Sequence, residues 1–367
     1  MCKGISGVFV IINGDSRKVQ LCLMQKLSIM KIIMKIIKKF FLFISVSITL
    51  LVLAGLIFRL LGAEPNQPEG KLIAVDGVKF HINATGKKSN KPTLVIEGGG
   101  GLPTEYYHWL SEGLKDSLRV VRYDRSGVGY SELGNTPRDA ETIAKELRKL
   151  LKNAGESPPY ILAGHSIGGT YIRVFTKLYP NEVAAVVFID ATHPEQVERF
   201  NAAPVSSFRF KSVIWGLNVA TFFADAGVLG LIESFTGPTF AGDGLPKEIN
   251  NRMRDMLLNG KGLRGYKGEL ENYHSNLKLA KIINQFEALP IRVFTAIKID
   301  KESYRERGIN PQKYLNKFIE AQKEFIDLSC IGKQVLIDGN HQTIFTKKKN
   351  ADIICREIVQ LLKELKS

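Results

Sequence analysis

The fold is decided by the stretch "YILAGHSIGGTYIRVFTKLYP" at residues 160–180, where an apolar run meets a helical pattern across a turn of small residues. A single hydroxyl, that of Ser166, stands in this turn, with Gly164 and Gly168 two positions away on either side. The G-x-S-x-G pattern at a strand-to-helix turn needs tiny neighbours, because a strained serine backbone would otherwise collide with them. The pattern predicts that Ser166 is a nucleophile, raised at the carboxyl edge of a sheet.

The segments around this turn alternate between short strands and helices. We expect a hairpin at 71–86 turning at Asp76 and Gly77, strands within 92–101, 118–131, 184–195, 290–297 and 333–337, and helices at 139–155 and at the C-terminus. Short β-branched runs that alternate with helices are typical of a mostly parallel sheet covered on both faces. The fold class expected is therefore α/β.

A serine hydroxyl needs a general base, and six histidines are available. His341 is our choice, because it follows the last predicted strand in the loop "GNHQTIF" and gives the chain order serine, acid, histidine. For the other histidines we expect a role in packing, in a pocket wall or on the protein surface. They are His81, His108, His165, His193 and His274.

The acid that orients the histidine has more than one candidate. Asp190 closes the run "VVFID", and Asp300 follows the next strand, with Glu302 close behind it. A carboxylate needs only to reach the imidazole nitrogen that does not face the serine, so either aspartate satisfies the chemistry. We favour Asp190 and keep Asp300 as the alternative.

These segments together resemble the α/β-hydrolase superfamily, and specifically its esterase-like and proline-iminopeptidase-like branch. The resemblance covers residues 72–365 through "VIEGGGG", "VVRYDRSGVGYSE", "ILAGHSIGG", "VVFIDATHPEQ" and "GNHQTIF". It implies an eight-stranded sheet, a catalytic triad, and an oxyanion hole formed by Ile167 with Gly99 or Gly100. The early loop begins with Glu97 rather than with the histidine that is common in the family. No Gly-x-x-Asp pattern follows residue 297, so we rank Asp190 above an aspartate at the family's usual acid position.

The N-terminal region explains much of the charge of +15. Residues 1–39 hold eight Lys and Arg against Asp15, and an apolar stretch follows at 40–58 that is long enough to cross a bilayer. We expect a basic cytoplasmic leader (1–39, with a doubtful start), a transmembrane helix (40–58), a linker (59–71) and an extracytoplasmic domain (72–367) at the cell membrane. Secretion after cleavage of a signal peptide is the alternative. The remaining positive charge is scattered, which argues against a nucleic-acid partner.

The longest interval between predicted strands, at about 192–288, is rich in phenylalanine. A structureless loop of this length is improbable in a compact domain, so we expect a helical cap above Ser166. The function expected is hydrolysis of a carboxylic ester or a related acyl compound through an acyl-enzyme, with no cofactor or metal. Serine at the turn argues against epoxide hydrolase and haloalkane dehalogenase chemistry. The alternatives are an aminopeptidase or amidase, with Glu97, Glu271 or Glu287 recognising the amine, and a catalytically silent binding domain.

Overall fold

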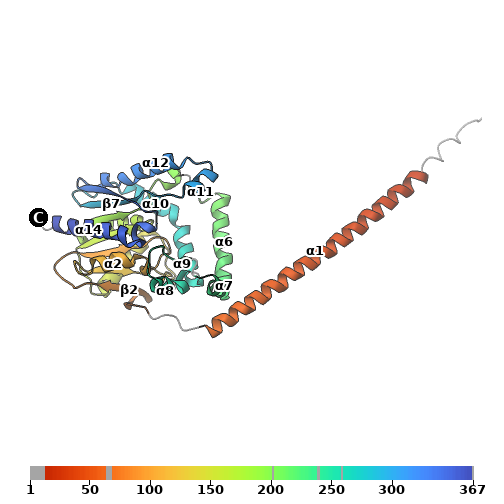
Figure 1. Cartoon of the computed structure of the whole chain (residues 1–367), viewed down its shortest axis with the longest axis horizontal. Helices are drawn as coiled ribbons and strands as arrows, with labels where there is room; N and C mark the ends of the chain where they lie inside the picture. Colours follow the sequence, from red (N-terminus) through yellow and green to blue (C-terminus); the bar gives the residue numbers. More distant parts are fainter. Residues whose placement is uncertain (1–12, 63–67, 201, 238–239, 258, 366–367) are drawn as a thin grey trace, which may run out of the picture.

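The computed structural model describes residues 13–62, 68–200, 202–237, 240–257 and 259–365. Parts of the expected leader (1–12) and linker (63–67) lie outside the described residues. A long helix projects from a body of sheet and helices (Figure 1). The strands are β1 (Lys71–Val75), β2 (Val78–Thr85), β3 (Thr93–Glu97), β4 (Val120–Tyr123), β5 (Tyr160–His165), β6 (Val183–Ile189), β7 (Ile291–Ala296) and β8 (Gly332–Ile337).

The eight strands form one sheet in the order β1-β2-β4-β3-β5-β6-β7-β8. The first two pairings are antiparallel and the other five are parallel, which confirms the expected mostly parallel sheet. The predicted hairpin is present, with positive φ at Asp76 (49°) and Gly77 (84°) in its turn. Because the parallel strands run in one direction, their carboxyl ends meet along one edge, and the loops that follow them come together there.

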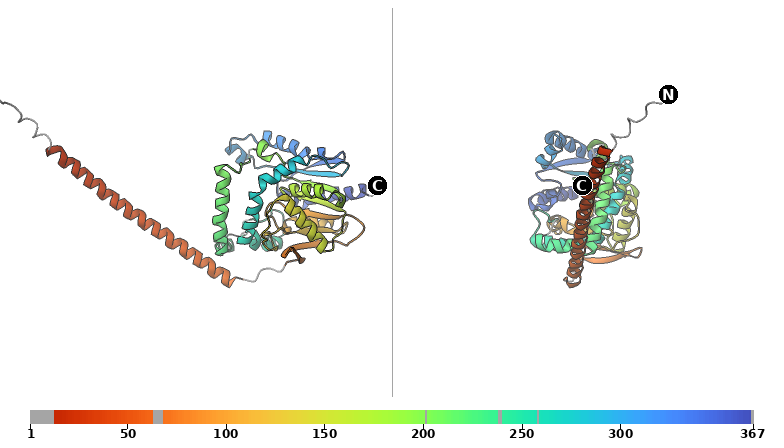
Figure 2. Two further views of the ribbon diagram at one scale, coloured as in Figure 1. Left: turned by 180° about the vertical axis from the view of Figure 1, so that it is seen from behind. Right: turned by 90° about the vertical axis from the view of Figure 1, so that its right-hand side faces the viewer.

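Helices cover both faces of the sheet (Figures 1 and 2). One apolar cluster packs α3 (Ala140–Asn153), α4 (Gly168–Leu178) and α10 (Tyr273–Ile282) against the strands, and a second packs α2 (His108–Leu114) and α14 (Lys348–Glu364) on the other face. The other described elements outside the cap are η1 (Thr104–Tyr107), η2 (Pro180–Glu182), α11 (Lys301–Glu306), α12 (Pro311–Lys323), η3 (Ile326–Leu328) and α13 (Thr343–Thr346).

In the described part of the interval between β6 and β7, where the sequence predicts a cap, five helices precede α10. They are α5 (Gln196–Phe200), α6 (Phe208–Asp225), α7 (Val228–Thr236), α8 (Lys247–Leu257) and α9 (Gly260–Glu271). Figure 1 shows α6 at the outer edge of the body, with α9 between it and the sheet. The cap therefore has an inner layer that faces the sheet edge and an outer layer that faces away from it.

The projecting helix α1 spans Asn13–Leu61 without a break, so the expected basic leader and the expected apolar stretch share one helix where they are described. Its part from Leu21 to Leu61 is long and apolar enough to cross a membrane, and almost none of it is buried against the body. Its C-terminal end contacts α7 of the cap. The apolar helix is thus attached to the outer layer of the cap.

Candidate active site

Ser166 occupies the turn between β5 and α4 with a positive φ of 54°. Few residues other than glycine adopt this backbone conformation, and such strain is concentrated at functional sites. The neighbouring glycines have a steric role: a Cβ on Gly164 would lie 2.6 Å from the Gly168 carbonyl oxygen. The turn predicted from G-x-S-x-G is present, and it leaves Ser166 half-buried rather than enclosed.

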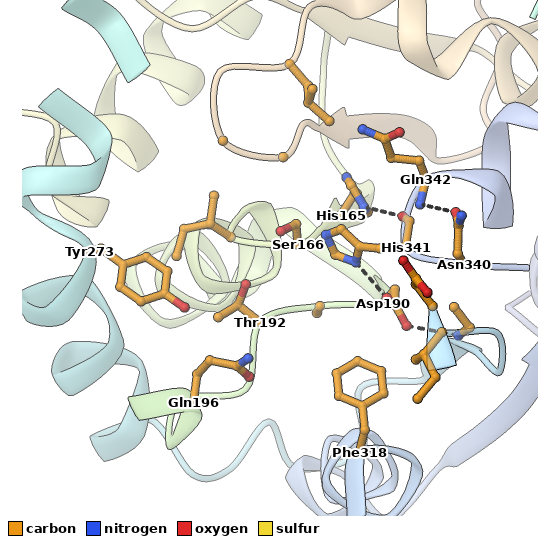
Figure 3. A pocket seen from close by; sticks show the side chains of 18 of the residues that line it. His165, Ser166, Asp190, Thr192, Gln196, Tyr273, Phe318, Asn340, His341 and Gln342 are labelled. Atoms are coloured by element: carbon orange, nitrogen blue, oxygen red, sulfur yellow. Dashed lines mark hydrogen bonds and ion pairs between the residues drawn. The ribbon is translucent and has the colours of Figure 1, made fainter. Parts of the chain in front are cut away.

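A cavity of about 730 Å³ lies above this turn, at the carboxyl edge of the sheet. Ser166, His341 and Asp190 all line it, although they come from three separate parts of the chain (Figure 3). The cap helix α9 contributes Tyr266, Glu269 and Leu270 to the lining, and α10 contributes Tyr273. The remaining lining includes Leu102, Ile299, Tyr304, Tyr314 and Phe318. The volume is in the range of pockets for small-molecule ligands.

Asp190 and His341 meet directly, with 2.6 Å between the carboxylate Oδ2 and the imidazole Nδ1. The other carboxylate oxygen of Asp190 accepts a hydrogen bond of 2.9 Å from the backbone N–H of Ala296 at the end of β7. The aspartate side chain is 3% exposed, whereas the histidine side chain is 50% exposed. A buried, doubly held carboxylate therefore orients an imidazole whose free face borders the cavity beside Ser166 (Figure 3).

Asp300 also lines the cavity, but its carboxylate binds the start of a helix rather than His341. It caps α11 by accepting hydrogen bonds of 3.2 Å from the backbone N–H groups of Glu302 and Ser303. Glu302 lies exposed in the first turn of that helix. Of the acids considered from the sequence, the structure brings Asp190 to His341.

The glycine-rich loop after β3 supplies backbone amides to the same cavity. The N–H of Gly99 donates to the Tyr107 hydroxyl at 2.7 Å, and the N–H of Gly101 donates to Glu269 at 3.2 Å. Within the described residues, the N–H of Gly100 has no such acceptor, and Gly100 lines the cavity together with Ile167 at the start of α4. Among the expected oxyanion donors, Ile167 and Gly100 are thus the ones available to a ligand.

His165 links this loop to the loop of His341. Its Nε2 lies 3.0 Å from the backbone carbonyl oxygen of His341, and its Nδ1 lies 3.1 Å from the Tyr107 hydroxyl. A carbonyl only accepts, so Nε2 carries the proton and the Tyr107 hydroxyl donates to Nδ1. Complete burial, followed by the nearby His341, lowers the pKa of His165 well below its usual 6.5. The neutral ring thus connects the loop of His341 to Tyr107, which in turn accepts from the glycine-rich loop.

Arg125, in the loop after β4, anchors the glycine-rich loop from below. Its guanidinium donates to the carbonyl oxygens of Gly98 (2.8 Å) and Gly99 (2.6 Å) and pairs with Glu97 (2.5 Å) and Glu269 (2.7 Å). All three charged side chains are at most 3% exposed. Burial raises the pKa of Glu97 although Arg125 and Tyr123 lower it, and burial lowers the pKa of Arg125 less than the two carboxylates raise it. The cap helix α9 is thereby tied to the loop that carries Gly100.

The other histidines lie outside the pair with Asp190. His81 is buried against Asp124 at 2.7 Å, and His193 lies 3.2 Å from Glu324. His108 stacks edge-on against Trp109, and His274 against Phe210. Only His165 and His341, of the six, line the cavity in the described structure.

The acids proposed for amine recognition do not line this cavity either. Glu97 is held by Arg125, Glu271 is exposed and lies 3.4 Å from Lys267, and Glu287 is exposed. Glu269 does line the cavity, but Arg125 neutralises it. The described lining therefore offers no unpaired carboxylate positioned for a free amine other than the exposed, helix-capping Asp300.

Two residues of the site were missed in the sequence. Tyr107 stands in "EYYHW", and no local pattern distinguishes its hydroxyl from that of Tyr106. Glu269 lies in the cap, 144 positions from its partner Arg125. Arg125 itself stands in the segment "YDRSG", whose glycine and polar residues are typical of a turn and do not indicate a role in the site.

Comparisons with known proteins agree with this fold. A family model described as alpha/beta hydrolase fold matches residues 92–223. The chain is 31% identical to the uncharacterized protein YbdG of Bacillus subtilis, over 39% of this chain and 44% of that protein. It is 30% identical to epoxide hydrolase 3 of Xenopus tropicalis, over 32% of each.

A solved structure, the enol-lactonase from Burkholderia xenovorans LB400, aligns with a TM-score of 0.54 at 16% identity, covering 80% of this chain and all of that one. At an identity this low, the structural alignment shows a shared fold and nothing further. The chain spans less than half the length of the first curated relatives that it matches.

Proposed function

From the α/β-hydrolase fold of this chain as a premise, we propose that it is a membrane-anchored serine hydrolase that cleaves a carboxylic ester through an acyl-enzyme. One observation carries the proposal: Ser166, at a strained turn, shares a cavity with His341, whose Nδ1 lies 2.6 Å from Asp190. A nucleophile, a base and an orienting acid in this arrangement are the parts that acyl transfer to water requires.

In the proposed first half-reaction, His341 Nε2 takes the proton of the Ser166 hydroxyl while Oγ attacks the ester carbonyl carbon. The N–H groups of Ile167 and Gly100 hold the negative oxygen of the tetrahedral intermediate. Asp190 keeps the proton of His341 on Nδ1 and stabilises the imidazolium that forms. Collapse of the intermediate breaks the carbon–oxygen bond, and the alcohol leaves with the proton from His341.

In the second half-reaction, water attacks the acyl-enzyme and His341 acts again as the base. The acid leaves, and Ser166 recovers its proton. The chemistry written here uses only groups of this chain and water. The single-pass anchor is proposed on the length and apolar composition of α1 and on the basic residues before Phe40, which favour an extracytoplasmic catalytic domain.

Labelling with a fluorophosphonate probe tests the proposal. The probe should react with the full chain and not with Ser166→Ala, whereas Ser206→Ala, which removes an exposed hydroxyl in the cap, should label like the parent. His341→Gln should also abolish labelling, because the serine then lacks its base. Absence of labelling in folded parent protein would instead support a silent binding domain.

A panel of p-nitrophenyl esters and aminoacyl p-nitroanilides, measured on the same preparations, separates ester from amide preference. We expect turnover of the esters to exceed that of the anilides, because the described lining offers an N-terminal amine only Asp300, whose carboxylate already caps α11. Faster turnover of an anilide with a free amine would favour the aminopeptidase alternative.

A further inference from the structure

Helix α6 carries a row of large apolar side chains on the outside of the body. Phe208, Trp215 and Phe222 follow one another at intervals of seven residues, so they lie on one face of the helix. They are 85%, 68% and 58% exposed. Three aromatic side chains of this exposure on one helix face mark an interaction surface rather than ordinary surface composition.

The next helix extends this surface. α7 exposes Phe235 (83%) and Ile232, and α6 and α7 together are as apolar as a membrane-spanning segment, although they are bent by 83° relative to each other. The inner side of α6 is held to the body: Phe210 is buried against His274. A helix that is held along one side to a folded body and exposes an apolar face on the other side is suited to lie on a bilayer surface.

The contact between α7 and α1 places this exposed apolar surface next to the helix that is long and apolar enough to cross a membrane. A Cβ on Gly55 of α1 would lie 2.6 Å from the carbonyl oxygen of Ala226, just before α7, and Gly230 of α7 faces the ring of Phe58. Small residues that let two backbones approach this closely are typical of packed helices in membranes. Gly55 lies within the apolar stretch, one turn before Arg59, so the start of α7 lies at the membrane boundary if α1 spans the bilayer.

The arrangement of the elements also places the exposed face of α6 on the side of the body from which α1 projects. In Figures 1 and 2, α1 leaves the body on the side where α6 lies, and α6 is the part of the body that faces it. Arg209 and Lys211, both exposed, lie beside Phe208 on α6. Basic side chains next to aromatic ones suit the headgroup region, where phosphates lie next to the acyl chains.

We propose that the outer face of α6 and α7, formed by Phe208, Trp215, Phe222, Ile232 and Phe235, lies in the headgroup region of the bilayer that α1 crosses. This inference rests on the proposed membrane anchor. The inner layer of the cap, α9, then separates the cavity from the membrane by one helix, because α9 contacts α6 on one side and lines the cavity on the other. The substrate class that fits this placement is an acyl ester that partitions into the bilayer.

Fluorescence of Trp215 tests the proposal without reference to catalysis. The chain has two tryptophans, Trp109 and Trp215, so Trp109→Phe leaves Trp215 as the single reporter. In the full chain reconstituted in phosphatidylcholine and phosphatidylglycerol vesicles, we expect lipids labelled with a nitroxide near the headgroup to quench Trp215 strongly. Lack of quenching, or protection of Trp215 in a dimer that persists in detergent, would overturn the proposal.

Substitution of the aromatic row tests its consequence for activity. The triple variant Phe208→Glu, Trp215→Glu, Phe222→Glu should hydrolyse a short water-soluble ester like the parent, but a long-chain ester held in vesicles about tenfold more slowly, as expected for a loss of about 1.4 kcal/mol in binding. Ile282→Glu is the control, because this exposed apolar residue lies at the end of α10, away from α6. Equal loss in the control, or no loss in the triple variant, would contradict the proposal.

Failure of the proposed function has a different signature. If the chain is not a serine hydrolase, the short ester is not hydrolysed by any variant and Ser166 is not labelled, yet the quenching of Trp215 is unaffected. If only the membrane contact is wrong, hydrolysis and labelling persist and the quenching is absent.

Discussion

The two halves of the site are built in opposite ways. On the histidine side, a half-exposed imidazole is held by one carboxylate, and the pair borders the cavity. On the oxyanion side, Glu97, Arg125 and Glu269 are buried together beneath the loop that carries Gly100. The first arrangement leaves a ring free to exchange protons, whereas the second fixes backbone amides in place. Substitutions on the histidine side should therefore affect turnover, and those on the oxyanion side should first affect stability.

The largest expected effect is on turnover. Asp190→Asn should lower kcat by about 10⁴-fold, because an amide N–H facing Nδ1 forces the proton of His341 onto Nε2, where the base must be free. The asparagine oxygen can still accept from Ala296, so the urea midpoint should change little. Ester hydrolysis and urea unfolding measure the two effects.

Asp300→Asn is the matched control for this substitution. It removes the same charge from the same cavity, but at a helix cap, and should leave kcat within a few-fold of the parent. A larger loss of kcat in Asp300→Asn than in Asp190→Asn would reverse the assignment of the acid.

The next effect is on stability. Arg125→Met should lower the free energy of unfolding by about 3–5 kcal/mol, because Glu97 and Glu269 would face each other in a buried site without their common cation. Denaturant titration of the detergent-solubilised chain measures this loss. Arg148→Met, which breaks an exposed pair with Glu182, should change stability little, since solvent screens such pairs. Equal effects of the two substitutions would show that the buried network does not stabilise the oxyanion side.

The smallest effect concerns His165, which joins the two halves. Its pKa is lowered in the folded chain, so below pH 6.5 the unfolded chain binds a proton that the folded chain does not. Its contribution to stability therefore decreases as the pH falls below 6.5, by at most about 1.4 kcal/mol per pH unit. His165→Gln, which cannot titrate, should lose less stability than the parent between pH 7 and pH 5.5 in urea unfolding.

His81 provides a control of opposite sign. Burial is the largest single influence and lowers its pKa, but the hydrogen bond and charge of Asp124, the backbone carbonyl of Glu69 and the charge of Glu105 together outweigh burial, so the net pKa is raised. Its contribution is therefore present below pH 6.5 and is lost as the pH rises through the raised pKa. His81→Gln should remove the loss of stability as the pH rises above 6.5 and should change the slope below pH 6.5 little, whereas His165→Gln should make the slope below pH 6.5 shallower. The same change in both variants would contradict the burial of a neutral His165.

Local patterns were sufficient for the sheet and for the turn of Ser166. The strands show as short apolar runs, and the two glycines beside the serine satisfy a steric requirement of a few consecutive residues. His341 could be chosen because a loop after the last strand must lie at the same edge as Ser166. The sequence left the acid open, since Asp190 and Asp300 both follow strands and differ only in where their side chains are used.

Other parts of the site depend on contacts between distant segments. Tyr107 and Glu269 carry no local signal, because each acquires its role from a partner elsewhere: His165 is 58 positions from Tyr107, and Arg125 is 144 from Glu269. The same holds for the exposed row on α6, whose residues are apolar in the sequence like those of any core helix.

By itself, the sequence determined the order of strands and helices, the bend at Ser166 and the apolar helix near the N-terminus, because each depends on side-chain size and polarity within a short window. Only the tertiary structure decided which carboxylate meets His341, which loop amide is free, and which apolar helix face stays uncovered. Those outcomes depend on how segments far apart in the chain compete for the same partners in space.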